Sequence, residues 1–333
     1  MFVFCFILFC VCCCFYLKRR FFPLSILFMA TYYPKKRTFG NMMFKSGKMN
    51  FVWRWRVFDY VTCVVFGLVG ALVGILVRPH CRPLAFNDTS ISQPPSHTET
   101  SPTYSVLIAV ILVIFIYATG EYFTWREHGK HMVAKHLNAW ILVQSFSVSL
   151  DYCIVNLCKL YAGRLRPDFI HRLAKEGITE SNFHQFTHDQ ICGAAREGRL
   201  SFPSGHASSA FAGFVPLVLY LLCRTGTLRT GAFYTAAASL LPLIFPLFVS
   251  ISRTRDNKHH FSDIVGGAVV GTFSALFSVF LSFVVGPTGD WVIRSESFNT
   301  SSAASAVGSV AQNPIEENEL RIICTVNSSN SAE

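Results

Sequence analysis

The stretch HHFSDIVGGAVVGTFSALFSVFLSFVV, residues 259–285, joins a polar cluster to a long apolar run. The run from Ile264 to Val285 is long enough for a helix that crosses a bilayer, which needs about 17–25 residues. A helix is the expected form because backbone polar groups in lipid must be paired within the segment. His259 and Asp263 stand at the mouth of this helix. The stretch therefore predicts a membrane protein with polar chemistry at a helix end.

The composition of the whole chain agrees with a membrane protein. Of its 333 residues, 51% are hydrophobic and 14% are charged, whereas globular chains carry about 25% charged residues. Six apolar stretches are long enough, or nearly so, to span a bilayer. We therefore expect an all-α integral membrane protein with six transmembrane helices. The stretches are Val57–Val77, Tyr104–Phe123, Ala139–Cys158, Ala207–Cys223, Phe233–Ile251 and Ile264–Val285.

Basic residues set the predicted orientation, because cytoplasmic loops carry an excess of Lys and Arg. They are concentrated before the first stretch, between the second and third, and between the fourth and fifth. Both termini are then cytoplasmic, and the first, third and fifth loops lie outside or in a lumen. These flanking residues and an anion site account for the net charge of +10, so no nucleic-acid partner is expected. The sequon at Asn87 would be open to glycosylation.

The chain divides into three predicted parts. Residues 1–48 form an apolar and basic segment, for which a signal anchor and a misassigned start both stay open. Residues 49–286 form the six-helix core, and residues 287–333, rich in Ser and Asn, are expected to be a disordered cytoplasmic tail. Cys81 and Cys192 fall in loops on the non-cytoplasmic side, where they could be oxidised, but their connectivity is not readable.

The polar cluster at the last stretch pairs a histidine with a carboxylate. His259 and Asp263 are four residues apart, so on a helix they share one face. The carboxylate can accept a proton from one imidazole nitrogen and leave the other as a nucleophile. The alternative is an ordinary interface histidine beside an aspartate that is favoured by the helix dipole.

A second cluster, Pro203-Ser204-Gly205-His206, opens the fourth stretch. A helix N-terminus offers unpaired N–H groups to an anion, and the glycine lets the anion approach. His206 could protonate a departing alkoxide. By itself the tetrapeptide would equally fit a turn and an N-cap.

Further cations flank these two clusters. Lys159 and Arg166 close the third stretch, and Arg253 precedes His259; a lysine offers a point charge and an arginine binds two phosphate oxygens. Arg164 and Pro167 are supporting residues. Single cations at such positions more often extend along the apolar surface to the membrane interface. Because topology places all the clusters on one face, we expect one phosphate-handling site at the non-cytoplasmic face.

The combination Lys-x6-Arg-Pro, Pro-Ser-Gly-His and Ser-Arg-x5-His-x3-Asp resembles the type 2 phosphatidate phosphatase superfamily, and its lipid phosphate phosphatase branch in particular. The resemblance covers about residues 59–285 and implies a six-helix membrane enzyme that needs no magnesium and no cofactor. It implies that His259 becomes a phosphohistidine, that Asp263 orients it and that His206 is the acid. It further implies that Lys159, Arg166, Arg253, Ser204 and Gly205 hold the phosphoryl group.

The leading hypothesis is a hydrolase that converts phosphatidate, or a related lipid phosphate, into diacylglycerol and phosphate. A related lipid phosphotransferase and a non-catalytic scaffold or transporter are the alternatives, and the complete clusters argue against both. The expected partners are lipid phosphates in the membrane. The endoplasmic reticulum, the Golgi and the plasma membrane stay open as locations, as does a homo-oligomeric state.

Overall fold

The computed structural model describes residues 55–96, 100, 103–128, 130–285 and 291–294. Apart from the first residues of α4, the bundle below lies in one compact unit, Tyr60–Glu333. Within the described residues, six helical stretches are long and apolar enough to cross a membrane, which confirms the predicted number. The principal helices are α4 (Val57–Leu76), α5 (Thr103–His128), α6 (Lys130–Ala162), α9 (Gly205–Arg224), α12 (Ile244–Arg255) and α13 (Phe261–Ser282).

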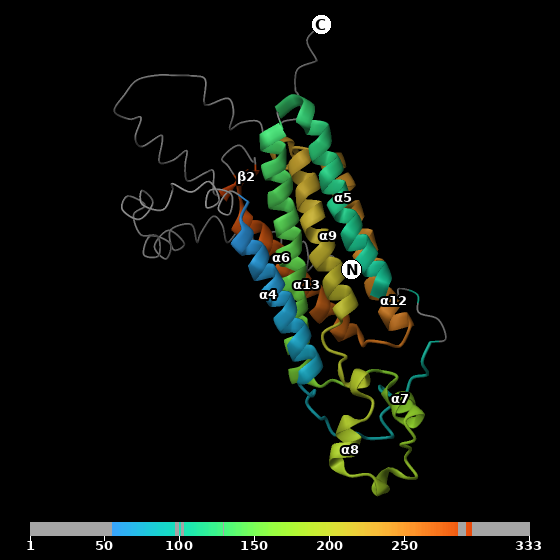
Figure 1. Ribbon diagram of the computed structural model, residues 1–333. Helices are drawn as coiled ribbons and strands as arrows, with labels where there is room; N and C mark the ends of the chain where they lie inside the picture. Colours follow the sequence, from blue (N-terminus) through green and yellow to red (C-terminus); the bar gives the residue numbers. More distant parts are fainter. Residues whose placement is uncertain (1–54, 97–99, 101–102, 129, 286–290, 295–333) are drawn as a thin grey trace, which may run out of the picture. The chain divides into compact units, whose positions relative to one another are not determined.

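Helix α9 is the centre of the bundle and contacts α5, α6, α12 and α13 (Figure 1). Its closest neighbour is α13, because glycines remove side chains from the contact. A Cβ atom at Gly271 would lie 2.1 Å from the carbonyl oxygen of Ser208, and one at Gly267 would lie 2.4 Å from that of Ser204. This close approach brings the N-termini of α9 and α13 together.

The helix ends differ from the expectation at three places. Helix α6 has 33 residues and continues to Ala162, so Lys159 lies in its last turn. The fifth span is α11 (Phe233–Leu240), a 3-10 turn η3 (Leu241–Leu243) and α12, since Pro242 interrupts regular α-helix hydrogen bonding.

The sixth span also ends earlier than expected. Strand β1 (Phe283–Val285) follows α13 and pairs antiparallel with β2 (Trp291–Ile293). This strand falls within the tail expected from residue 287 onward to be largely disordered, and pairing with β1 satisfies its backbone. The remainder of the predicted tail and the segment 1–48 lie outside the described residues.

The connection between α6 and α9 is a small folded layer at one end of the bundle (Figure 1). It contains α7 (Phe169–Lys175), η1 (Phe183–Gln185), α8 (His188–Gly193) and η2 (Arg196–Arg199). Phe169 and Leu173 of α7 are fully buried and pack with Ile91 from the α4–α5 connection. The layer thus has an apolar core of its own.

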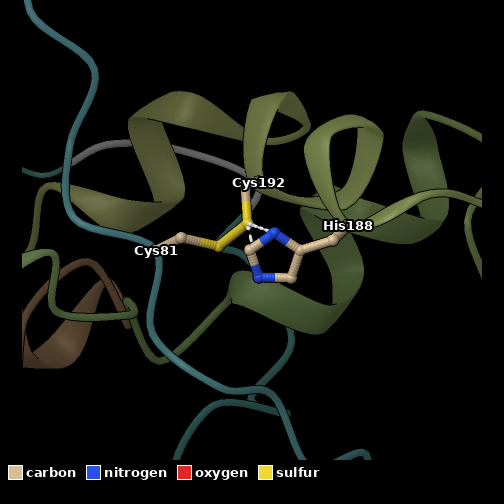
Figure 2. A group of neighbouring side chains, drawn as sticks. All are labelled: Cys81, His188 and Cys192. Atoms are coloured by element: carbon tan, nitrogen blue, oxygen red, sulfur yellow. Dashed lines mark hydrogen bonds between the residues drawn. A yellow bond between two sulfur atoms is a disulfide. The ribbon is translucent and has the colours of Figure 1, made fainter.

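A disulfide between Cys81 and Cys192 links the α4–α5 connection to α8, which settles the connectivity that the sequence left open (Figure 2). His188, one turn earlier on α8, lies with its ring against this bond, 3.5 Å from the Cys192 sulfur. These three residues have the grouping of metal ligands. Both sulfur atoms are in the disulfide, however, so His188 alone keeps an unused ligand atom.

Candidate active site

The three sequence clusters meet where α6 and α12 end and α9 and α13 begin. The backbone N–H of Ser204, the N-cap of α9, donates to the carbonyl of Asp263 in the first turn of α13 (2.9 Å). The Lys159 ammonium lies 3.1 Å from the position that a Cβ at Gly205 would take. Segments about 100 residues apart in sequence therefore form one polar centre.

His259 is buried in this centre, with 4% of the residue exposed. Its Nδ1 lies 2.8 Å from the carbonyl oxygen of Ser201 and 3.7 Å from Oδ2 of Asp263. Because a carbonyl only accepts, Nδ1 carries the proton and Nε2 keeps a lone pair. Burial, helped by the nearby charges of Arg166 and Lys159, lowers the pKa of His259 to about 3. The imidazole is thus neutral at physiological pH.

Asp263 is fully buried and accepts three hydrogen bonds. The donors are the Ser201 hydroxyl at 2.6 Å, the Arg164 guanidinium at 2.7 Å and the backbone N–H of His260 at 2.9 Å. Arg164, expected as a supporting residue, forms an ion pair with this carboxylate. Ser201 contacts both His259 and Asp263 and was not singled out from the sequence. Its only signal was its place in the Ser-Phe-Pro-Ser-Gly-His run.

The N-terminus of α9 is the candidate anion-binding element of the centre. The Ser204 hydroxyl is buried and makes no hydrogen bond within the described part of the chain. Gly205 and His206 follow in the first turn, where backbone N–H groups have no helical acceptor. Pro203 precedes them after a cis peptide bond. A phosphoryl oxygen placed here would meet N–H groups, a hydroxyl and the Lys159 charge.

Two arginines complete the set of cations, and each is held by a carboxylate. Arg253, 1% exposed, binds Asp256 at 2.7 Å, and Asp256 also accepts the hydroxyl of Thr100. Arg166 lies 3.9 Å from Glu197 in η2. Neither carboxylate was predicted, because nothing in the sequence distinguishes them from surface acids. Such pairs limit the directions in which a long side chain can point.

Two other predicted residues lie outside this centre. The carbonyl of Pro167 accepts the backbone N–H of Gln93, and so joins the connection after α6 to the one after α4. Asn87 is exposed on that same α4–α5 connection. Its surface position is compatible with a glycosylation site, and it takes no part in the polar centre.

The profile of the PAP2 superfamily matches residues 140–285, the region that holds all three clusters. Probable lipid phosphate phosphatase 4 of Arabidopsis thaliana is 31% identical over 226 residues, which are 66% of this chain and 70% of that protein. The chain belongs to the PAP2 superfamily. Its predicted membership is thereby confirmed, and it is an enzyme of the lipid phosphate phosphatase family.

Two further PAP2 relatives widen the comparison. Diacylglycerol pyrophosphate phosphatase 1 of Saccharomyces cerevisiae is 29% identical over a region that makes up 67% of this chain and 78% of that protein. Phospholipid phosphatase 2 of Bos taurus is 26% identical over a region that makes up 68% of this chain and 82% of that protein. No solved structure shows a significant match. The PAP2 assignment and the six spans together make the chain a multi-pass integral membrane protein.

Proposed function

We propose that this PAP2 enzyme hydrolyses phosphatidate and related lipid phosphates to diacylglycerol and phosphate, without magnesium and through a phosphohistidine at His259. The observation that carries the proposal is the buried, neutral His259, whose Nδ1–H is held by the Ser201 carbonyl beside the N-terminus of α9. A neutral imidazole with a fixed tautomer has its other nitrogen ready for attack on phosphorus.

In the first step, Nε2 of His259 attacks phosphorus and the bond from phosphorus to the glycerol oxygen breaks. His206 gives its proton to the leaving alkoxide, which departs as diacylglycerol. The imidazole becomes cationic as the P–N bond forms, and Asp263, 3.7 Å from Nδ1, stabilises that charge. Lys159, Arg166 and Arg253 neutralise the phosphoryl oxygens.

In the second step, water attacks the phosphorus and gives a proton to His206. The P–N bond breaks, inorganic phosphate leaves and His259 returns to its neutral form. His206 is protonated again, so it is ready to act as the acid in the next cycle. Both steps use the same cations and the same N–H groups of α9.

We also propose that the catalytic end of the bundle faces a lumen or the outside. The Cys81–Cys192 disulfide lies at that end, and disulfides persist in oxidising compartments. Arg224 and Arg229 lie at the other end of α9, as cytoplasmic loops require. The endoplasmic reticulum, the Golgi and the plasma membrane all meet this condition.

The test measures phosphate release from phosphatidate in detergent micelles with a chelator present. We expect wild-type activity to persist, His259→Ala to lower kcat at least about 10³-fold, and His184→Ala, at an exposed loop histidine, to have no effect. An acid-labile phosphoenzyme should form in the wild type only.

Equal rates for wild type and His259→Ala, or a strict need for magnesium, would overturn the proposal. An added alcohol acceptor distinguishes the alternative chemistry. If phosphate is transferred to the acceptor instead of being released, the enzyme is a phosphotransferase.

A further inference from the structure

A groove of about 1320 Å³ borders the catalytic centre. Its apolar wall comes from the last turns of two helices, Val73 with Val77 near the end of α4, and Leu157 with Leu160 and Tyr161 on α6. Tyr161 is almost fully exposed. The groove is larger than the ~300–1,000 Å³ typical of small-molecule sites.

The lining of this groove also carries cations. Arg78, His80 and Arg82 follow directly after α4, and Arg164 lines the groove from the connection after α6. A single carboxylate, Asp88, lies among these three arginines. Apolar helix ends that give way to arginines at the membrane boundary match a phospholipid, with its acyl chains beside the helices and its phosphate beside the guanidinium groups.

The segment from Arg78 to Arg82, called the cationic segment below, is held in place before any ligand arrives. Cys81 is joined to α8 by the disulfide (Figure 2), and the backbone N–H of His80 donates to the Leu160 carbonyl at 2.8 Å. The Nε of Arg82 donates to the Ala162 carbonyl at 2.7 Å. Gly163 permits the close approach of this segment to the end of α6, because its φ is +54° and a Cβ there would lie 2.0 Å from the His80 carbonyl oxygen.

The arginine donors of this segment are not consumed by these contacts. Within the described part of the chain, Arg82 uses only its Nε in hydrogen bonding, and the Arg78 guanidinium forms no hydrogen bond or ion pair. Two forked donors therefore remain available to a phosphodiester group.

The groove is distinct from the catalytic centre. It is lined by neither of the two proposed catalytic histidines, His259 and His206. The three cations of the proposed phosphoryl site, Lys159, Arg166 and Arg253, are also absent from its lining. The two share a boundary, because Arg164 and His260 line the groove and also bind Asp263. We propose that this groove binds an anionic phospholipid that is not the substrate, with the lipid phosphate on Arg78 and Arg82. This inference does not depend on the proposed function.

The experiment uses phosphatidylglycerol, which is anionic but has no phosphomonoester to hydrolyse. The full-length protein in nanodiscs is titrated with phosphatidylglycerol that carries a photoreactive acyl chain, and the adducts are mapped by mass spectrometry. Adducts are expected on the ends of α4 and α6. Excess phosphatidylcholine or inorganic phosphate should not compete.

Variants distinguish binding in the groove from a general attraction of anionic lipid to the protein. The double variant Arg78→Gln, Arg82→Gln should weaken phosphatidylglycerol binding at least tenfold. Arg229→Gln, at the other end of the bundle, should bind like the wild type. An unchanged thermal unfolding temperature verifies that the double variant is folded. Unchanged binding by the double variant, equal competition by phosphatidylcholine, or adducts confined to the segment around His206 would overturn the proposal.

Discussion

Asp263 is the residue on which the geometry of the centre converges. Its carboxylate is fully buried and keeps its charge balanced through Arg164, Ser201 and the backbone of His260. A buried carboxylate is tolerated when donors of this kind surround it. Since Ser201 also accepts from His259 through its carbonyl, one residue links the carboxylate to the imidazole.

The buried histidine predicts a dependence of stability on pH. Burial lowers the pKa of His259 to about 3, whereas an unfolded histidine titrates near 6.5. Below pH 6.5 the unfolded state binds the proton and the folded state does not, so stability is full above pH 6.5 and falls as the pH drops toward 3. We expect the thermal unfolding temperature to fall between pH 6.5 and 4.5 and to fall less in His259→Gln.

Intrinsic fluorescence during heating in detergent would measure this difference. His184→Gln, which changes an exposed histidine, should keep the wild-type pH dependence. Parallel curves for wild type and His259→Gln would contradict the role of burial at this position.

Among the elements, the contact between α9 and α13 decides whether His206 and His259, the proposed acid and nucleophile, can act together. His206 lies in the first turn of α9, and His259 lies two residues before the first residue of α13. Because Gly267 and Gly271 lie against the α9 backbone, the two N-termini are held at a short distance. Small residues serve this purpose between membrane helices generally.

Adding one methyl group to this contact should separate the two helices. In Gly271→Ala the new Cβ would meet the Ser208 carbonyl, and overpacking of this kind costs about 1–3 kcal/mol. We expect a lower unfolding temperature and a drop in kcat of about tenfold or more, measured on the same purified protein. Gly67→Ala on α4, whose Cβ would meet nothing within 4 Å, is the matched control. Equal behaviour of the two variants would refute this account of the packing.

At the scale of the whole molecule, the disulfide ties the two connections that cover the catalytic end. Cys81 and Cys192 are 111 residues apart in sequence, so the bond closes a loop that contains α5 and α6. A crosslink over a long loop stabilises chiefly by restricting the unfolded chain, typically by about 2–4 kcal/mol.

Cys192→Ser should therefore lower the unfolding temperature by about 5 °C. Treatment of the wild type with a dithiol should have the same effect, and the variant should show no further change. Cys158→Ser, at a free cysteine of α6, serves as the control. If reduction leaves the wild-type unfolding temperature unchanged, the disulfide has no stabilising role.

Much of the architecture was readable from local patterns. Hydrophobicity is a property of each segment by itself, so five of the six spans were found to within about four residues at each end, while the third begins six residues earlier than expected. Even so, Pro242 divided a span that appeared continuous, and β-pairing of Phe283–Val285 shortened another. Those two features depend on backbone hydrogen bonding, which hydrophobicity does not encode.

The sequence by itself determined the helices, the three polar clusters and the family, because spacing along one helix and membrane length are local quantities. Only the tertiary structure decided the partners. Arg164 binds Asp263, 99 residues away, and the Ser201 carbonyl reaches His259 across 58 residues. The Cys81–Cys192 bond likewise joins residues that are far apart in the sequence. Such contacts arise from the close packing of α9 against α13 and from the folded layer between α6 and α9. No local pattern specifies which side chains that packing brings together.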